Sequence, residues 1–93
     1  SGSTARWVSK LRPRQPILAL SQHLSTVRRL NLCWGVYPVL ISGWKDTDDM
    51  LERSKRMPKE LGMATQGDKI VIIAGVPISI PGTTNLIKVE MVE

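Results

Sequence analysis

The sequence is poor in the residue types on which several classes of protein depend. Its 93 residues include no phenylalanine, one tyrosine, one histidine and one cysteine. A single cysteine excludes a disulfide within the chain and suits a reducing compartment. Cys33 lies in an apolar helical stretch, which favours an inert buried thiol over a reactive one. His23 has no cysteine or carboxylate cluster beside it, so metal binding or catalysis by this histidine is not expected.

Long apolar runs are also missing. No run reaches the roughly 18 residues of a membrane-spanning helix, and the chain does not open on a signal-peptide pattern. We therefore expect a cytoplasmic protein without a membrane partner. The length suits one small domain.

The net charge of +5 raises the alternative of a basic, stand-alone module that binds nucleic acid. The basic residues occur in every segment, however, and most are interpreted as the solvated faces of helices. The shortage of aromatic residues leaves few platforms on which the bases of a single strand could stack. We expect no nucleic-acid partner.

The most informative stretch is Gly67–Val92. Residues Ile70–Ala74 form an unbroken, largely β-branched apolar run after a Gly-Asp turn, which predicts a strand buried on both faces. Gly75–Thr84 holds two prolines and two glycines and predicts a loop. Leu86–Val92 alternates, which predicts a half-buried strand at a sheet edge. Its predicted inward residues are Ile87, Val89 and Met91, and its outward residues are Lys88 and Glu90.

The upstream sequence predicts helices alternating with strands. The predicted order is a helix from about Thr4 to Arg12, a strand at Ile17–Leu20, a helix over 22–34, a strand at Val36–Ile41, and a helix from Asp46 or Thr47 to Leu61. Pro58 interrupts the last helix and predicts a kink or two shorter helices. This alternation predicts an α/β fold, a three-layer sandwich whose mostly parallel sheet has an antiparallel last strand.

Three blocks carry a family resemblance: SGSTARWVSKLRPRQPILAL, RRLNLCWGVYPVL and GDKIVIIAGVPISIPGTTNLIKV. In this order they resemble the C-terminal domain of pyruvate kinases, and the similarity runs from Ser1 to the last residue. The resemblance implies that residues 1–93 form most of that domain. The family's first, central strand and its two preceding helices are then missing, so we expect a fragment of a longer chain.

The resemblance also implies a function. The parent enzyme would transfer a phosphoryl group from phosphoenolpyruvate to ADP in glycolysis, with Mg²⁺ or Mn²⁺ and often K⁺. The residues for this chemistry would lie in a separate barrel domain, so we expect no catalytic residue, metal ligand or cofactor in this chain. Its role would be regulation and assembly of a homotetramer, with the edge strand Leu86–Val92 as the candidate contact between copies.

A candidate effector site lies at the start of the first helix. A helix N-terminus attracts anions, although Ser1-Gly2-Ser3-Thr4 alone is more typical of a plain N-cap than of a phosphate site. The family's effector-phosphate loop resembles Thr-x-Ser-Gly-x-Ser/Thr, which Ser1, Gly2 and Thr4 match. The resemblance therefore implies that these residues and Ser3 bind the phosphate of an allosteric effector.

Eukaryotic members hold a second phosphate with a tryptophan, an arginine and a loop. Trp44 lies near the place of that tryptophan, with a packing role as the equal alternative. Met50 stands where the arginine would align, and Gly75–Gly82 lacks the basic and aromatic residues of the loop. A sugar or nucleotide monophosphate is therefore expected rather than a bisphosphate.

The remaining polar and aromatic residues have simpler interpretations. Trp7 and Trp34 lie at helical spacing within apolar stripes, which favours packing in the core or at an interface. Asp48, Asp49 and Glu52 are better explained by the positive end of a helix dipole than by a bound cation. An independent enzyme would need a catalytic constellation, and the sequence contains no nucleophile, dinucleotide or phosphate-loop motif.

Overall fold

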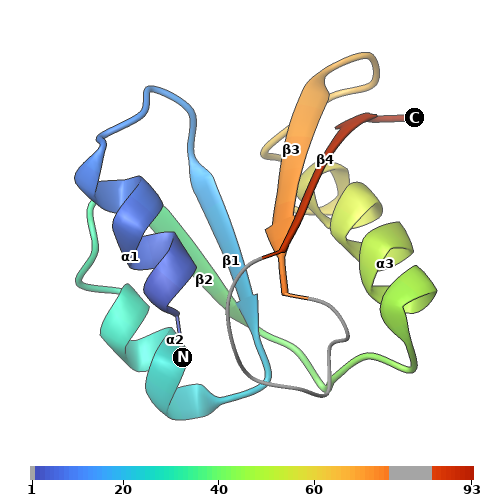
Figure 1. The fold of residues 1–93 in the computed structure, drawn as a ribbon. Helices are drawn as coiled ribbons and strands as arrows, with labels where there is room; N and C mark the ends of the chain where they lie inside the picture. The colour runs from blue at the N-terminus through green and yellow to red at the C-terminus, as the bar shows by residue number, and fades with distance from the viewer. Residues whose placement is uncertain (1, 76–84) are drawn as a thin grey trace. The chain divides into compact units, whose positions relative to one another are not determined.

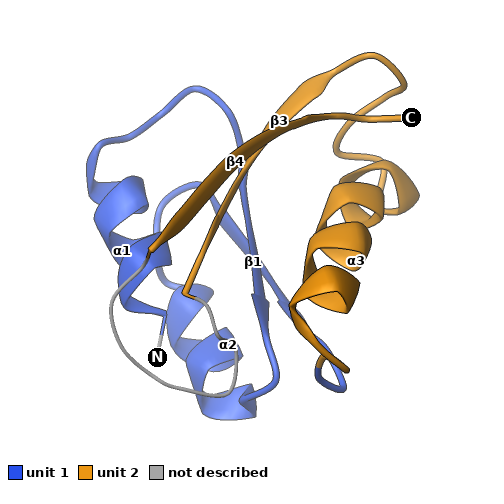
Figure 2. Cartoon of the chain, turned by 45° about the vertical axis from the view of Figure 1, so that its right-hand side comes forward, with its two compact units in different colours: residues 1–43 blue, residues 44–93 orange. Residues whose placement is uncertain are grey.

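The computed structural model describes residues 2–75 and 85–93. Its elements, in chain order, are α1 (Ser3–Lys10), β1 (Ile17–Ser21), α2 (Leu24–Leu30), β2 (Val36–Leu40), α3 (Thr47–Glu60), β3 (Lys69–Ala74) and β4 (Leu86–Met91) (Figure 1). The chain divides into two compact units, residues 1–43 and 44–93 (Figure 2). No helix among the described residues is both long enough and apolar enough to cross a membrane.

The first unit is built on a parallel pair of strands. β1 and β2 pair in register from Ile17↔Val36 to Ser21↔Leu40, and α2 forms the crossover between them. Helix α2 packs on both strands, and α1 packs on β1. The buried hydrophobic side chains of this unit are Leu30, Val36 and Ile41.

The second unit is an antiparallel pair with one helix. β3 and β4 pair in register from Lys69↔Met91 to Ala74↔Leu86, and α3 packs against β3. Its buried hydrophobic side chains are Met50, Ile72 and Val92. The parallel pair, the antiparallel last strand and the alternating helices confirm the predicted α/β class.

The apolar face of the last two strands differs from the prediction. The sequence predicts β3 to be buried on both faces, yet Val71 is 60% exposed and Ile73 is 40% exposed. The predicted inward residues of β4 are also exposed, namely Ile87, Val89 and Met91. The register explains both errors, because Val71 lies opposite Val89 and Ile73 lies opposite Ile87, so these side chains share one face. The other face includes the buried Ile72 and packs against α3.

Two helices also differ from the prediction. The second helix is predicted over 22–34 but spans Leu24–Leu30, and the chain then tightens into turns in which Leu32 and Cys33 donate to the carbonyls of Arg29 and Leu30. Of the two outcomes predicted at Pro58, two shorter helices are wrong, because α3 is one helix of 14 residues, and a kink stays a prediction. Pro58 lies in its last turn, so the helix lacks one hydrogen bond there, the one that an N–H at this position would donate to the Ser54 carbonyl. Its carbonyl accepts from Met63 N at 2.8 Å, which helps to close the helix end.

Candidate functional site

The start of α1 is shaped by Gly2. This residue is the N-cap, with φ 80°, and as a glycine it has no side chain with which to cap the helix. A Cβ atom at this position would lie 3.0 Å from Thr26 Cγ2 and 3.2 Å from Leu30 Cδ1. Only glycine combines this left-handed backbone with so close an approach to α2. The sequence therefore fixes the helix start against the buried side of α2.

Three of the four predicted effector-site residues come together at this helix start. Gly2 precedes α1, and Ser3 and Thr4 are its first two residues, with Ser3 exposed and Thr4 half-buried. Ser1 lies outside the described residues. The first turn contains no acidic residue, so no carboxylate competes with an anion for the positive end of the helix dipole. The local geometry is compatible with a phosphate group.

Trp44, the other predicted effector contact, opens the second unit. The Arg53 guanidinium lies 4.8 Å from the centroid of its ring, within cation–π range. Arg53 also lies 3.8 Å from the Asp49 carboxylate. Sequence reasoning missed Arg53 because it sought the arginine at Met50, which is only 5% exposed and belongs to the core. No sequence signal pointed to Arg53, because its proximity to Trp44 depends on how the chain turns into α3.

The acidic residues before and within the first turn of α3 act as helix caps. Asp46 is the N-cap, as predicted, and its Oδ1 accepts from Asp49 N at 2.7 Å. Asp49 Oδ2 accepts from Lys45 N at 2.9 Å. No group of three histidine, cysteine, aspartate or glutamate side chains suited to a metal ion occurs among the described residues. The carboxylates in this part of the chain therefore have a structural explanation.

The end of the chain is held to α3 by charged groups. Lys55 Nζ donates to the Glu93 carboxylate and lies 3.9 Å from Glu90, while Lys59 Nζ donates to the Glu93 backbone oxygen at 2.9 Å. The hydrogen bond from Lys55 lowers the pKa of Glu93, and the same hydrogen bond raises the pKa of Lys55. These groups are exposed, so the contact is a surface one.

Both tryptophans that were expected to pack lie largely at the surface. Trp7 is 68% exposed, with Lys10 Nζ 4.7 Å from the centroid of its ring, and Trp34 is 46% exposed. Trp34 lies beyond the end of α2 rather than on its inward face. A core role is therefore wrong for both residues, and packing at an interface stays a prediction for them.

Comparison with known proteins identifies the class of domain and then its family. Residues 1–90 match the family model described as "Pyruvate kinase, alpha/beta domain". The chain belongs to this family. It is 41% identical over 93 residues to a pyruvate kinase of Clostridium acetobutylicum, covering all of this chain and 20% of that protein. It is 47% identical over 92 residues to a pyruvate kinase of Staphylococcus haemolyticus, covering 99% of this chain and 16% of that protein.

These relatives bear out the resemblance to the C-terminal domain of pyruvate kinases. A third one, a pyruvate kinase of Staphylococcus aureus, is 45% identical over 92 residues, again 16% of its length. The chain therefore spans a fifth or less of the curated relatives that it matches.

Proposed function

We propose that this chain is the regulatory and assembly domain of a pyruvate kinase, a longer enzyme that transfers a phosphoryl group from phosphoenolpyruvate to ADP. The family match over residues 1–90 carries this proposal. The parent's Mg²⁺ or Mn²⁺, and often K⁺, would be bound in the separate barrel domain that the resemblance implies. The single cysteine is compatible with a cytoplasmic enzyme of glycolysis.

The regulatory role rests on the start of α1. A phosphorylated effector, a sugar or nucleotide monophosphate, binds there through the first-turn backbone and the hydroxyl groups of Ser3 and Thr4, with Ser1 and Gly2 completing the loop. The absence of acidic residues from this turn and the close packing of Gly2 on α2 support the assignment. Trp44 remains a predicted effector contact, and within the second unit the Arg53 guanidinium lies beside its ring.

The assembly role rests on β4. This strand pairs with β3 along one edge, and in the described part of the chain no strand pairs with its other edge. An unpaired edge is a template for pairing with a second copy. We assign this edge to the contact between copies in a homotetramer.

The enzymatic part of the proposal is tested by a pyruvate-forming assay on the full-length polypeptide that carries this sequence. Phosphoenolpyruvate and ADP with Mg²⁺ and K⁺ are expected to give pyruvate and ATP. A sugar or nucleotide monophosphate is expected to change the dependence of the rate on phosphoenolpyruvate, and Thr4→Ala to remove that effect while leaving the basal rate. A polypeptide that forms no pyruvate under these conditions would refute the assignment.

A further inference from the structure

Ser9 is a polar residue in the interior of the first unit, where it is only 6% exposed. Most serines lie at protein surfaces, and a buried hydroxyl group costs free energy unless it is hydrogen-bonded. Ser9 Oγ donates to Trp34 O at 2.6 Å, which joins the last turn of α1 to the turn before β2. A serine in a helix can instead donate to a carbonyl of its own helix, so this bond is a specific tertiary contact.

Helix α1 is fixed within the unit at both of its ends. At its start, Gly2 lies against Thr26 and Leu30 on α2, which are 4% and 2% exposed. At its end, Ser9 is bonded to the carbonyl of Trp34. A helix of eight residues is about 12 Å long, so the candidate effector site and the Ser9 contact are two turns apart on one short helix.

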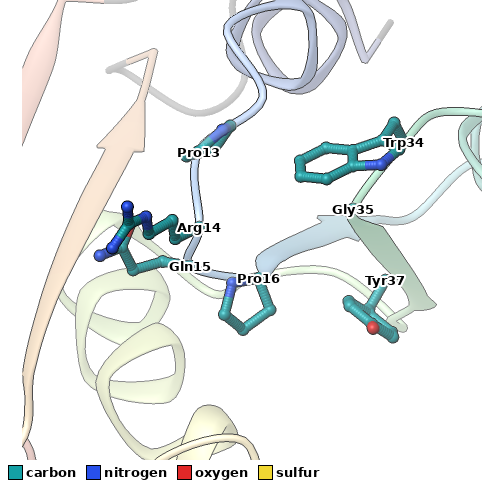
Figure 3. A pocket seen from close by; sticks show the side chains of 7 residues that line it. All are labelled: Pro13, Arg14, Gln15, Pro16, Trp34, Gly35 and Tyr37. Atoms are coloured by element: carbon teal, nitrogen blue, oxygen red, sulfur yellow. The ribbon is translucent and has the colours of Figure 1, made fainter.

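The turn at residues 31–35 lies at the surface of the unit. Within it, Cys33 N donates to Leu30 O at 3.0 Å. Trp34 is 46% exposed and borders an open pocket (Figure 3). The Arg12 guanidinium, just beyond α1, lies 5.3 Å from the centroid of the Trp34 ring. Exposed turns open locally at a small free-energy cost, so a single tertiary bond affects how often this turn opens.

We propose that α1 transmits the occupancy of the effector site to the turn at residues 31–35 through the Ser9–Trp34 hydrogen bond. This rests on the proposed function, in which a phosphorylated effector binds at Ser3 and Thr4. A helix of eight residues is marginally stable by itself, and an anion at its N-terminus stabilises it. A bound phosphate therefore keeps the last turn of α1 formed, Ser9 stays in place to donate, and the turn at residues 31–35 opens less often.

A second route from the effector site to the same turn would run along α2. Gly2 touches Thr26 and Leu30, and the turn follows α2 directly in the chain. The two routes differ in one atom, the Oγ of Ser9, which only the route through α1 uses. Removing this atom therefore separates them.

Hydrogen exchange of the full-length polypeptide, measured by mass spectrometry, tests the proposal. The probes are glucose 6-phosphate and AMP, a sugar and a nucleotide monophosphate, each at a concentration that saturates its effect on the melting temperature. The peptides to follow cover residues 31–36, in which the N–H groups of Cys33 and Val36 are hydrogen-bonded. A bound monophosphate is expected to slow their exchange about fivefold or more, the lower end of ordinary couplings between sites.

Ser9→Ala is expected to abolish this slowing while the monophosphate still raises the melting temperature. Ser25→Ala is the matched control, because Ser25 is an exposed serine in the first turn of α2, and it should keep the slowing. A purely structural role for Ser9 would instead speed exchange equally with and without the probe, so that the slowing remains.

Three results overturn the proposal: slowing that survives Ser9→Ala, slowing that both variants lose, and no slowing in the unaltered polypeptide. A Ser9→Ala variant that no longer binds either probe would also contradict it. In that case the hydrogen bond would be needed to form the effector site and would not be a link from it.

The melting temperature keeps this inference separate from the proposed function. A monophosphate that raises the melting temperature without slowing exchange at residues 31–36 refutes only the link through Ser9. If no monophosphate raises the melting temperature, the effector site itself is refuted, and the pyruvate-forming assay still decides the enzymatic assignment.

Discussion

Gly2 links the proposed effector site to the packing of the first unit. Its backbone lies in the left-handed region at φ 80°, and its α-carbon approaches Thr26 and Leu30 on α2. Any side chain there both strains the backbone and pushes α1 away from α2. The helix start that would receive a phosphate is therefore also a packing point.

Gly2→Ala should lower the free energy of unfolding by more than the left-handed backbone alone costs. Gly35→Ala is the matched control, because Gly35 has φ 69° in the same unit but nothing within 4 Å of its added Cβ. We expect about 1 kcal/mol for Gly35→Ala from backbone strain and a further 1 kcal/mol or so for Gly2→Ala from overpacking. Denaturant unfolding measures both, and equal losses would show that the contact with α2 is unimportant.

The N-cap of α3 gives a second prediction at the residue scale. Asp46→Ala removes the oxygen that accepts from Asp49 N and should cost about 1 kcal/mol of stability. Asp48→Ala is the control, because it also removes one negative charge from the helix start while leaving the cap in place. If the two variants melt alike, the effect is one of charge and the cap contributes nothing measurable.

The contact between Lys55 and Glu93 predicts a pH dependence. Because the pKa of Glu93 is lower in the folded chain, its contribution is present above the ordinary glutamate range and is lost as pH falls through the lowered value. Because the pKa of Lys55 is raised, its contribution is present below the ordinary lysine range and is lost as pH rises through the raised value. Glu93→Gln should therefore reduce stability slightly at neutral pH and make no difference in strong acid.

A series of unfolding measurements across the pH range checks this expectation. Glu60→Gln at the end of α3 is the control and should not lower stability, since it removes a negative charge from the negative end of a helix dipole. A loss for Glu93→Gln that persists unchanged in strong acid would contradict the linkage. High salt should weaken the effect, because both groups are exposed.

At the scale of elements, the β3–β4 pair has one covered and one open face. Ile72 is 8% exposed and lies on the face toward α3, while its neighbour Ile73 is 40% exposed on the other face. The two isoleucines are identical in chemistry and adjacent in sequence. Replacing each of them by alanine therefore shows how burial affects the free energy of unfolding while the residue type is the same.

Ile72→Ala should destabilise the 93-residue chain by about 2 to 5 kcal/mol, because it leaves a cavity between the strand and α3. Ile73→Ala should cost less, about 1 to 2 kcal/mol, since Ile73 is already 40% exposed and its truncation opens no cavity against α3. Urea unfolding of both variants provides the comparison. Equal losses would mean that the face of Ile73 is covered in solution.

These strands also show what their sequence could and could not predict. The β-branched run and the alternation correctly indicated two strands, because they report local conformation. They could not indicate which face is covered, since that depends on the register and on which elements pack there. Pro58 was misjudged for a related reason: its local cost does not decide whether the helix continues, because α3 is also stabilised by its packing on β3.

At the scale of the whole molecule, the sequence blocks were enough to indicate the family, whereas composition alone was not. Gly2, Ser3 and Thr4 lie together at a helix start because they are adjacent in sequence, and their binding of an effector phosphate stays a prediction. Arg53 was missed, since its proximity to Trp44 follows from how the chain turns into α3.

The most direct test of this account is a thermal melt of the chain with a panel of sugar and nucleotide monophosphates. A ligand that binds only the folded form stabilises it by about 2.7 kcal/mol at a hundredfold excess over its dissociation constant. We predict that at least one of these compounds raises the melting temperature and that Thr4→Ala abolishes the rise. A cooperative melt that no phosphorylated compound shifts would contradict the effector site.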